Sequence, residues 1–154
     1  MPPGEEGKIT LQIKTKGYRG NLLKRAKVYT NEPSGRFQVV SIKAFVKVPI
    51  FLSVRHVYLR GPADRKLTKT VGIRAGMDKA LTLEESQFTL SEKVTYRIEE
   101  LESGKNFRIH FTSIPGNVGT YRGVLKLKTN YSEKPEVIIW ITVQFRKPTQ
   151  SQEN

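Results

Sequence analysis

Residues 121–145 read YRGVLKLKTNYSEKPEVIIWITVQF, and this stretch decides the fold. In its first half, Leu125 and Leu127 alternate with Lys126 and Lys128, and the second half is also apolar at every second position. Alternation with a period of two is typical of a strand that buries one face. Turn-forming residues separate the two halves. The stretch therefore predicts two antiparallel strands, at residues 121–129 and 136–145.

A second copy of this pattern lies 99 positions earlier in the chain. The dipeptide Thr30-Asn31 recurs as Thr129-Asn130, and the inward and outward positions of the flanking strands coincide at the same offset. A one-residue gap brings residues 9–13 onto residues 107–111. We interpret the two segments as copies of one three-strand unit. The matched positions include Gly20 with Gly119, Ala26 with Leu125, Lys27 with Lys126, Val28 with Leu127, and Val40, Ile42, Ala44 and Val46 with Ile139, Ile141, Val143 and Phe145.

The rest of the chain has the same short strand spacing. Turn signals such as Gly61-Pro62, Ser103-Gly104 and Pro115-Gly116 separate the apolar runs, and no segment shows a persuasive helical pattern. Many short strands separated by turns favour an antiparallel sandwich. The further strands are predicted at residues 8–16, 22–30, 37–48, 50–59, 68–73, 80–83, 94–101 and 106–113.

The sequence thus predicts an all-β chain in two parts. Residues 49–148 have the usual size of one immunoglobulin-like antiparallel β-sandwich, about 100 residues. Residues 1–48 contain only the last three strands, a three-stranded partial copy of the same domain, and residues 149–154 are predicted to be a disordered tail. The side chains expected to face the interior of the complete domain are Ile109, Phe111, Leu125, Leu127, Ile139, Ile141 and Val143.

The two Thr-Asn dipeptides mark predicted hairpin turns. The first turn reads Thr30-Asn31-Glu32-Pro33-Ser34-Gly35, in which Asn tolerates a left-handed backbone, Pro fixes its φ and Gly allows a positive φ. We expect Asn31 and Asn130 to close their hairpins, with a positive φ at Asn130, rather than to contact a ligand. The residues of this structural turn motif are Gly20, Thr30, Asn31, Pro33, Gly119, Thr129, Asn130 and Pro135.

These residues resemble the signature of a known family: a Pro-Gly-acid start, an alternating strand, a glycine turn, and Thr-Asn followed by Pro. The chain is similar to the bacterial immunoglobulin-like domain family of unknown function that is related to ASPM/Hydin-type and major-sperm-protein-like domains. The resemblance implies a seven-stranded, non-enzymatic β-sandwich, often in tandem and, in bacteria, usually exported. The matching residues are Pro3-Gly4-Glu5, Ile9–Ile13, Gly17–Gly20 and Thr30-Asn31-Glu32-Pro33, and, in the second copy, Gly119, Thr129-Asn130 and Pro135 after a longer turn.

The chain is strongly basic, with 27 Lys and Arg against 14 Asp and Glu, a net charge of +13 and a pI near 10.1. Such a charge favours contact with polyanions, either nucleic acid or an anionic surface. The cations are dispersed, however, and many alternate with apolar residues, as on a strand face in water. We therefore interpret the charge first as a solvated surface. The candidate polyanion-binding residues are Lys14, Lys16, Arg25, Lys27, Lys126 and Lys128.

The chemistry-bearing side chains indicate no catalytic, cofactor-binding or metal-binding residue. The chain has no cysteine, and His56 and His110 are far apart in the sequence. Glu84-Glu85 and Glu99-Glu100 are adjacent pairs, which point to opposite faces of a strand and are poor acid and base partners. No phosphate-binding loop, dinucleotide fingerprint or Gly-x-Ser-x-Gly elbow occurs. We expect Trp140 to pack within the sandwich or against a strand neighbour rather than to form a ligand platform.

The function that best fits these patterns is a non-enzymatic structural or protein-interaction module. The alternative is a polyanion binder that uses its basic strand faces. No cofactor, membrane-spanning segment or signal peptide is predicted, and the expected partner is an unidentified protein. Because residues 1–48 lack the sheet that would cover their apolar face, we expect self-association through residues 8–48, in preference to folding of that segment back onto the complete sandwich.

The start of the chain also leads to an expectation about its origin. With Pro2-Pro3-Gly4, the sequence enters the family signature in the middle of a domain and not at its first strand. We therefore expect Met1 to have been added to a fragment of a longer tandem-repeat protein. An exported parent would place the chain in the periplasm or elsewhere outside the cytoplasm.

Overall fold

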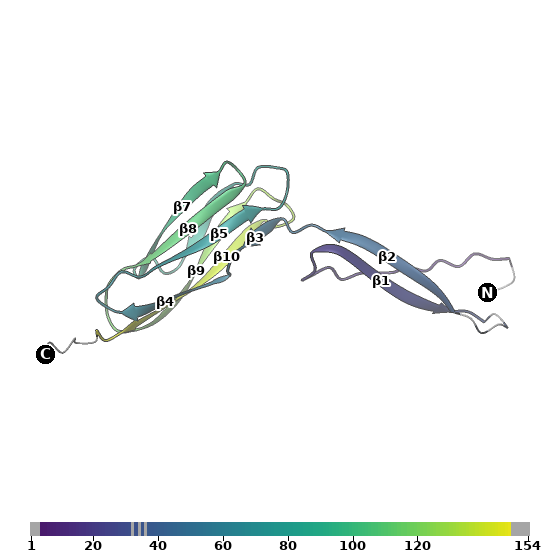
Figure 1. The fold of residues 1–154 in the computed structure, drawn as a ribbon, viewed down its shortest axis with the longest axis horizontal. Coiled ribbons are helices and arrows are strands. Elements are labelled where there is room, and N and C mark those ends of the chain that lie inside the picture. Colours follow the sequence, from purple (N-terminus) through teal and green to yellow (C-terminus); the bar gives the residue numbers. More distant parts are fainter. Residues whose placement is uncertain (1–3, 32, 34, 36, 149–154) are drawn as a thin grey trace. The chain divides into compact units, whose positions relative to one another are not determined.

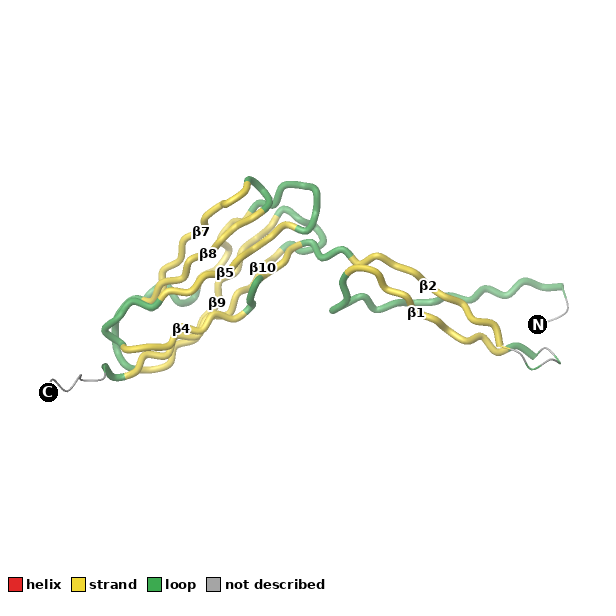
Figure 2. Tube along the Cα trace, in the orientation of Figure 1, coloured by secondary structure: helices red, strands yellow, loops and turns green. Residues whose placement is uncertain are grey.

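The computed structural model describes residues 4–31, 33, 35 and 37–148. The described residues form strands and loops, and none of them belongs to a helix that could span a membrane. Figures 1 and 2 show the path of the chain. The strands of the described residues are β1 (Gly20–Tyr29), β2 (Phe37–Val46), β3 (Ile50–Leu52), β4 (His56–Pro62), β5 (Thr68–Ala75), β6 (Leu83–Phe88), β7 (Val94–Glu102), β8 (Asn106–Ser113), β9 (Gly119–Thr129) and β10 (Glu136–Arg146).

The chain divides into two compact units, Met1–Lys47 and Val48–Asn154, which we call unit 1 and unit 2. The division falls beside the predicted boundary between residues 48 and 49. The predicted disordered tail, residues 149–154, lies outside the described residues.

Unit 2 is the predicted immunoglobulin-like β-sandwich. One sheet has the strand order β4-β10-β9-β6 and the other has the order β3-β5-β8-β7. Figure 1 shows the two layers facing each other. Strand pairs are antiparallel in both sheets except β4 and β10, which run parallel with His56 beside Trp140 and Pro62 beside Arg146.

The core of unit 2 lies between these two sheets. All seven side chains predicted to face the interior are buried, each with at most 1% of its surface exposed. They come from β8, β9 and β10, whose alternating sequence places every second side chain against the opposite sheet. Strands β4 and β5 add Val57, Leu59, Val71 and Ile73 to the same core.

The predicted strand at residues 50–59 is wrong, because the structure divides this apolar run between the two sheets. β3 pairs with β5, whereas β4 pairs with β10 in the other layer. Ser53 lies at the crossing, where its backbone N–H donates to the Gly72 carbonyl at 2.9 Å and its Oγ accepts the Gly72 N–H at 2.9 Å. These bonds satisfy the backbone where the chain leaves one sheet for the other.

The predicted strand at residues 80–83 is also misplaced, because the strand in this region is β6. Its middle four residues, Glu84 to Gln87, are all exposed polar side chains. Only Leu83 and Phe88 pack against the core. An edge strand with this composition has no apolar alternation, so the periodicity could not locate it.

Unit 1 has two strands in the described residues, and the predicted third strand at residues 8–16 is wrong. In the predicted repeat, this segment corresponds to β8, which in unit 2 receives ladder hydrogen bonds from β5 on one side and β7 on the other. Unit 1 has no described counterpart of β5 or β7. Segment 8–16 therefore has the alternating sequence of a strand but no neighbour with which to form a ladder, and Figure 2 shows it as a loop.

Candidate functional site

The hairpin formed by β1 and β2 repeats the register of the hairpin formed by β9 and β10. Gly20 pairs with Val46 and Val28 pairs with Gln38 in the first hairpin. The positions 99 residues later are paired in the same way in the second hairpin, Gly119 with Phe145 and Leu127 with Val137. The correspondence found in the sequence therefore extends to the hydrogen-bonded partners. It also identifies which side of β1 and β2 is the inward face.

The inward face of unit 1 is less covered than its counterpart in unit 2 at most positions, although Leu22 is buried. Val40 is 37% exposed, whereas Ile139 at the matching position is fully buried. Val28 is half-buried where Leu127 is fully buried. In unit 2 this face is covered by the sheet of β3, β5, β7 and β8. Among the described residues of unit 1, only segment 8–16 lies in that place, so the apolar face is partly open to water.

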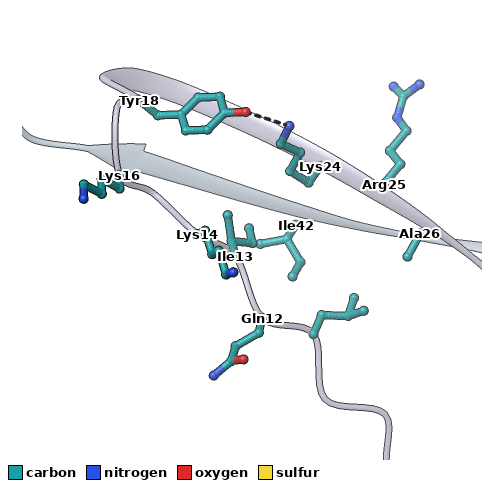
Figure 3. A pocket seen from close by; sticks show the side chains of 10 residues that line it. Gln12, Ile13, Lys14, Lys16, Tyr18, Lys24, Arg25, Ala26 and Ile42 are labelled. Carbon is teal, nitrogen blue, oxygen red and sulfur yellow. Dashed lines mark hydrogen bonds between the residues drawn. The ribbon is translucent and has the colours of Figure 1, made fainter.

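Segment 8–16 and the inward face of unit 1 enclose an open groove of about 450 Å³. Figure 3 shows Ile13 turned toward Ile42 across this groove. The rim is basic, and Lys24 Nζ donates a hydrogen bond to the Tyr18 hydroxyl at 3.2 Å. The groove is thus apolar at its base and cationic at its rim. Its lining residues are Leu11, Gln12, Ile13, Lys14, Lys16, Tyr18, Lys24, Arg25, Ala26 and Ile42.

Asn130 holds the chain segment that enters β6. Its side-chain oxygen accepts the Thr82 N–H at 3.0 Å, and its side-chain nitrogen donates to the Ala80 carbonyl at 2.8 Å. No described residue other than glycine has a positive φ, so the expectation of a positive φ at Asn130 is wrong. The amide side chain acts across the sheet instead, because it presents a donor and an acceptor to one extended backbone. We call this arrangement the asparagine latch.

The other residues of the turn motif lie at the ends of the two hairpins. Gly20 and Gly119, which begin β1 and β9, have φ values of 74° and 156°, where glycine has the least strain. The Thr129 N–H donates to the Pro135 carbonyl at 2.9 Å and closes the turn between β9 and β10. In the first hairpin, Thr30, Asn31 and Pro33 are exposed in the turn, whereas Glu32, Ser34 and Arg36 of that turn lie outside the described residues.

The six predicted polyanion-binding cations are divided between the two units. Lys14, Lys16 and Arg25 line the groove of unit 1, and Lys27 lies over the Phe37 ring with Nζ 4.5 Å from its centroid. Lys126 and Lys128 point outward from β9 in unit 2. Lys128 is flanked in register by Glu136 of β10 and Glu84 of β6, so acidic neighbours offset its charge.

A cluster that the sequence did not reveal lies on the outer face of β4 and β10. Trp140 is 55% exposed, so it does not pack within the sandwich, and it lies in register beside His56. His56 stacks on Tyr58 with ring centroids 4.1 Å apart, and the Arg60 guanidinium lies 5.4 Å from the Tyr58 centroid. We call these four residues the aromatic cluster. β4 meets the distant β9–β10 hairpin here, because Arg122 of β9 is paired with Thr142 beside Tyr58.

Several other titratable groups have hydrogen-bonded partners within unit 2. His110 Nε2 lies 2.8 Å from Glu99 Oε2, and this hydrogen bond is the main cause that lowers the pKa of Glu99. Burial, and a hydrogen bond to Glu85, raise the pKa of Tyr96. Glu99 and Glu100 have separate partners, since Glu99 contacts His110 whereas Glu100 accepts the Gly104 N–H, as expected for adjacent strand residues. Within the described part of the chain, no group of three or more acidic and histidine side chains could hold a metal ion.

Comparison with known proteins found no matching family model and no matching curated protein. Among solved structures, the chain is similar to the crystal structure of domains 4 and 5 of the S-layer protein SbsC. The sequence identity is 15% and the TM-score is 0.36. The similarity covers 70% of this chain and 59% of the S-layer structure, so the chain spans less than two thirds of that structure.

Proposed function

We propose that this chain is a non-enzymatic structural or protein-interaction module in which unit 2 is a closed sandwich and unit 1 pairs with strands of another polypeptide. The observation that carries the proposal is the identical register of the two hairpins in different surroundings. β9 and β10 have β6 and β4 at their outer edges, whereas β1 and β2 have no further strand in the described residues. Free edges and an open apolar face are the features that β-strand addition uses.

The outward face of unit 1 supports the same function. It carries large apolar side chains that are exposed in addition to those of the inward face. An isolated two-stranded hairpin is only marginally stable in water, so a polypeptide that covered these side chains would stabilise unit 1. This arrangement fits a piece of a tandem-repeat protein of the resembled immunoglobulin-like family. The exposed outward residues are Leu23, Tyr29, Phe37, Val39 and Phe45.

Amide hydrogen exchange on the full chain tests this proposal. The β1 amides that point away from β2 are expected to exchange fast, because no strand of the described residues pairs with them. The matching amides of β9 are protected by β6. Sedimentation of the same sample reports whether a second copy is bound. Equal protection of β1 and β9 in a monomeric chain would mean that the edge is already closed and would refute the proposal.

The aromatic cluster supports a second candidate function, the binding of a polyanion with stacking rings. The strand segments that carry it, residues 56–62, 119–124 and 140–146, contain Arg60, Arg122 and Arg146 and no acidic residue. An exposed Trp beside arginines can stack on a base while the guanidinium groups contact phosphates. This is the association of aromatics and cations that the sequence did not indicate.

A salt titration of single-stranded DNA binding measures this second function. Replacing Trp140 by Ala is expected to weaken binding by about five- to a hundredfold, as lost base stacking does. Arg122→Ala should lower the slope of log affinity against log salt by about 1, whereas Lys128→Ala, beside its two glutamates, should leave that slope nearly unchanged. A full chain that does not bind DNA at low salt would exclude this function.

A further inference from the structure

We propose that the free edge of β1 accepts an acidic β-strand, which adds antiparallel to β1 and is held at its entry by Asn31. This inference rests on the proposed function and names the partner: an extended peptide with carboxylates between apolar residues. Three features of the described residues lead to it. They are the position of β6 on β9, the asparagine latch, and the charge of unit 1.

The position of β6 shows where the added strand would lie. In unit 2, β6 runs antiparallel to β9, with Leu83 paired with Thr129 and Phe88 paired with Leu125. Transferred at the same offset, this register places a strand along residues 26–30, the last part of β1 and the residue after it. β6 packs its two terminal apolar side chains against the core and keeps polar side chains between them. A strand added to β1 would cover the half-buried Ala26 and Val28 in the same way.

The asparagine latch shows how the strand would enter. Asn130 bonds the backbone at Ala80 and Thr82, immediately before β6 begins. Asn31 is the matching residue of unit 1, and it is exposed at the end of β1. The Asn31 amide therefore offers one donor and one acceptor to a backbone that passes this position. The latch accounts for a Thr-Asn dipeptide at the end of both hairpins without requiring a positive φ.

The charge of unit 1 specifies the chemistry of the strand. Its residues 1–47 contain ten Lys and Arg against three Glu, and Lys24, Arg25 and Lys27 all lie on β1. On β9 the corresponding edge is met by β6, where Glu84 is in register with Lys128. Transferred to β1, this register places the carboxylate beside Tyr29, with Lys27 as its diagonal neighbour on the same face. An acidic strand would be attracted to β1, whereas the β1–β2 hairpin of a second copy would bring its own positive charge. The charge thus favours a different polypeptide over self-association.

The two hairpins differ at one position that limits the length of the added strand, Gly123 in β9 and Lys24 in β1. At Gly123 a Cβ would lie 2.7 Å from the Leu90 Cβ, so glycine is needed where the chain after β6 crosses β9. Unit 1 has Lys24 at that position. A leucine placed like Leu90 would meet the Lys24 side chain, which keeps its ammonium near the Tyr18 hydroxyl. The added strand must therefore end, or carry an acceptor group, at this point.

The peptide Asp78–Phe88 of this chain is a suitable probe, because it contains the latch contacts and β6 but stops before Leu90. NMR titration of this peptide into the labelled full chain is expected to shift the amides of Lys24 to Asn31, and added salt should weaken the binding. Asn31→Ala should lower the affinity about five- to thirtyfold, the effect of two lost hydrogen bonds. Asn21→Ala is the matched control, since Asn21 is exposed at the other end of β1.

Several outcomes would overturn the inference. They are the absence of shifts on β1, shifts confined to β9 of unit 2, equal affinities of the Asn31 and Asn21 variants, and undiminished binding of a peptide with Glu84→Lys and Glu85→Lys. Concentration-dependent protection of the β1 edge without peptide would identify a second copy as the occupant. If hydrogen exchange shows an open edge but the peptide does not bind, only this inference fails. A closed edge in the monomer contradicts the proposed function as well.

Discussion

Replacing Leu127 by Ala is expected to lower the free energy of unfolding of unit 2 by about 2–5 kcal/mol, whereas Val28→Ala should leave it unchanged. Leu127 is fully buried between the two sheets, so truncation removes apolar contacts and leaves a cavity. Val28 has the same place in the β1–β2 hairpin but belongs to unit 1 and is half-buried. Denaturant titration with Trp140 fluorescence measures the transition, because this single tryptophan lies in unit 2.

The comparison of these two variants tests whether the two units fold independently. An equal loss of stability in both variants would mean that Val28 contributes to the folding of unit 2, which would contradict the division of the chain into two units. A loss below about 1 kcal/mol in Leu127→Ala would show that its surroundings collapse onto the shorter side chain. Circular dichroism of both variants before denaturation verifies that the β structure is retained.

Gly76→Ala is expected to destabilise unit 2 by about 1–3 kcal/mol or more, because the added methyl group has no space. A Cβ at Gly76 would lie 1.9 Å from the Val48 carbonyl oxygen and 2.9 Å from Phe51 Cε2. The first of these atoms belongs to the backbone and cannot move aside by a change of rotamer. The Gly76 N–H also donates to the Pro49 carbonyl at 2.8 Å, which fixes the approach of the two segments.

Gly116→Ala is the matched control for this prediction. A Cβ at Gly116 would have its nearest atoms 3.8 Å and 4.0 Å away, at the Ile114 carbonyl oxygen and Lys93 Nζ. Its effect on the thermal midpoint should be small, since the alanine meets ordinary van der Waals distances. If Gly76→Ala, Gly116→Ala and the unaltered chain have the same thermal midpoint, Gly76 does not lie as close to the Val48 carbonyl as the structure places it.

Strand periodicity was enough to predict the sandwich and its central strands, because these have one wet and one buried face. The same periodicity gave wrong predictions where the formation of a strand depends on which strands are beside it. Residues 8–16 have the alternation of β8 but no flanking strands, and residues 50–59 form one apolar run that the structure divides between two sheets. Strand β6 was missed for the opposite reason, since its partners hold it although its own sequence is polar.

The candidate sites were predictable only in part. The Thr-Asn repeat was visible in the sequence, but its role depends on the backbone at Ala80 and Thr82, about 50 residues away in the chain. Local turn preferences therefore led to a positive φ that the structure does not have. The aromatic cluster arises from the parallel pairing of β4 with β10, and no spacing in the sequence indicates that His56 and Trp140 are neighbours.

The parallel pairing of β4 with β10 has a mechanical consequence. These strands lie near the beginning and the end of unit 2 and are joined over seven residue pairs, from His56 with Trp140 to Pro62 with Arg146. Tension between the two ends of the unit would pull β4 toward its start and β10 toward its end, and so load their hydrogen bonds in shear. Bonds loaded in shear must break together, whereas bonds peeled from a hairpin break one after another. The parallel pairing of β4 with β10 is therefore the contact of unit 2 that would oppose tension between these two strands.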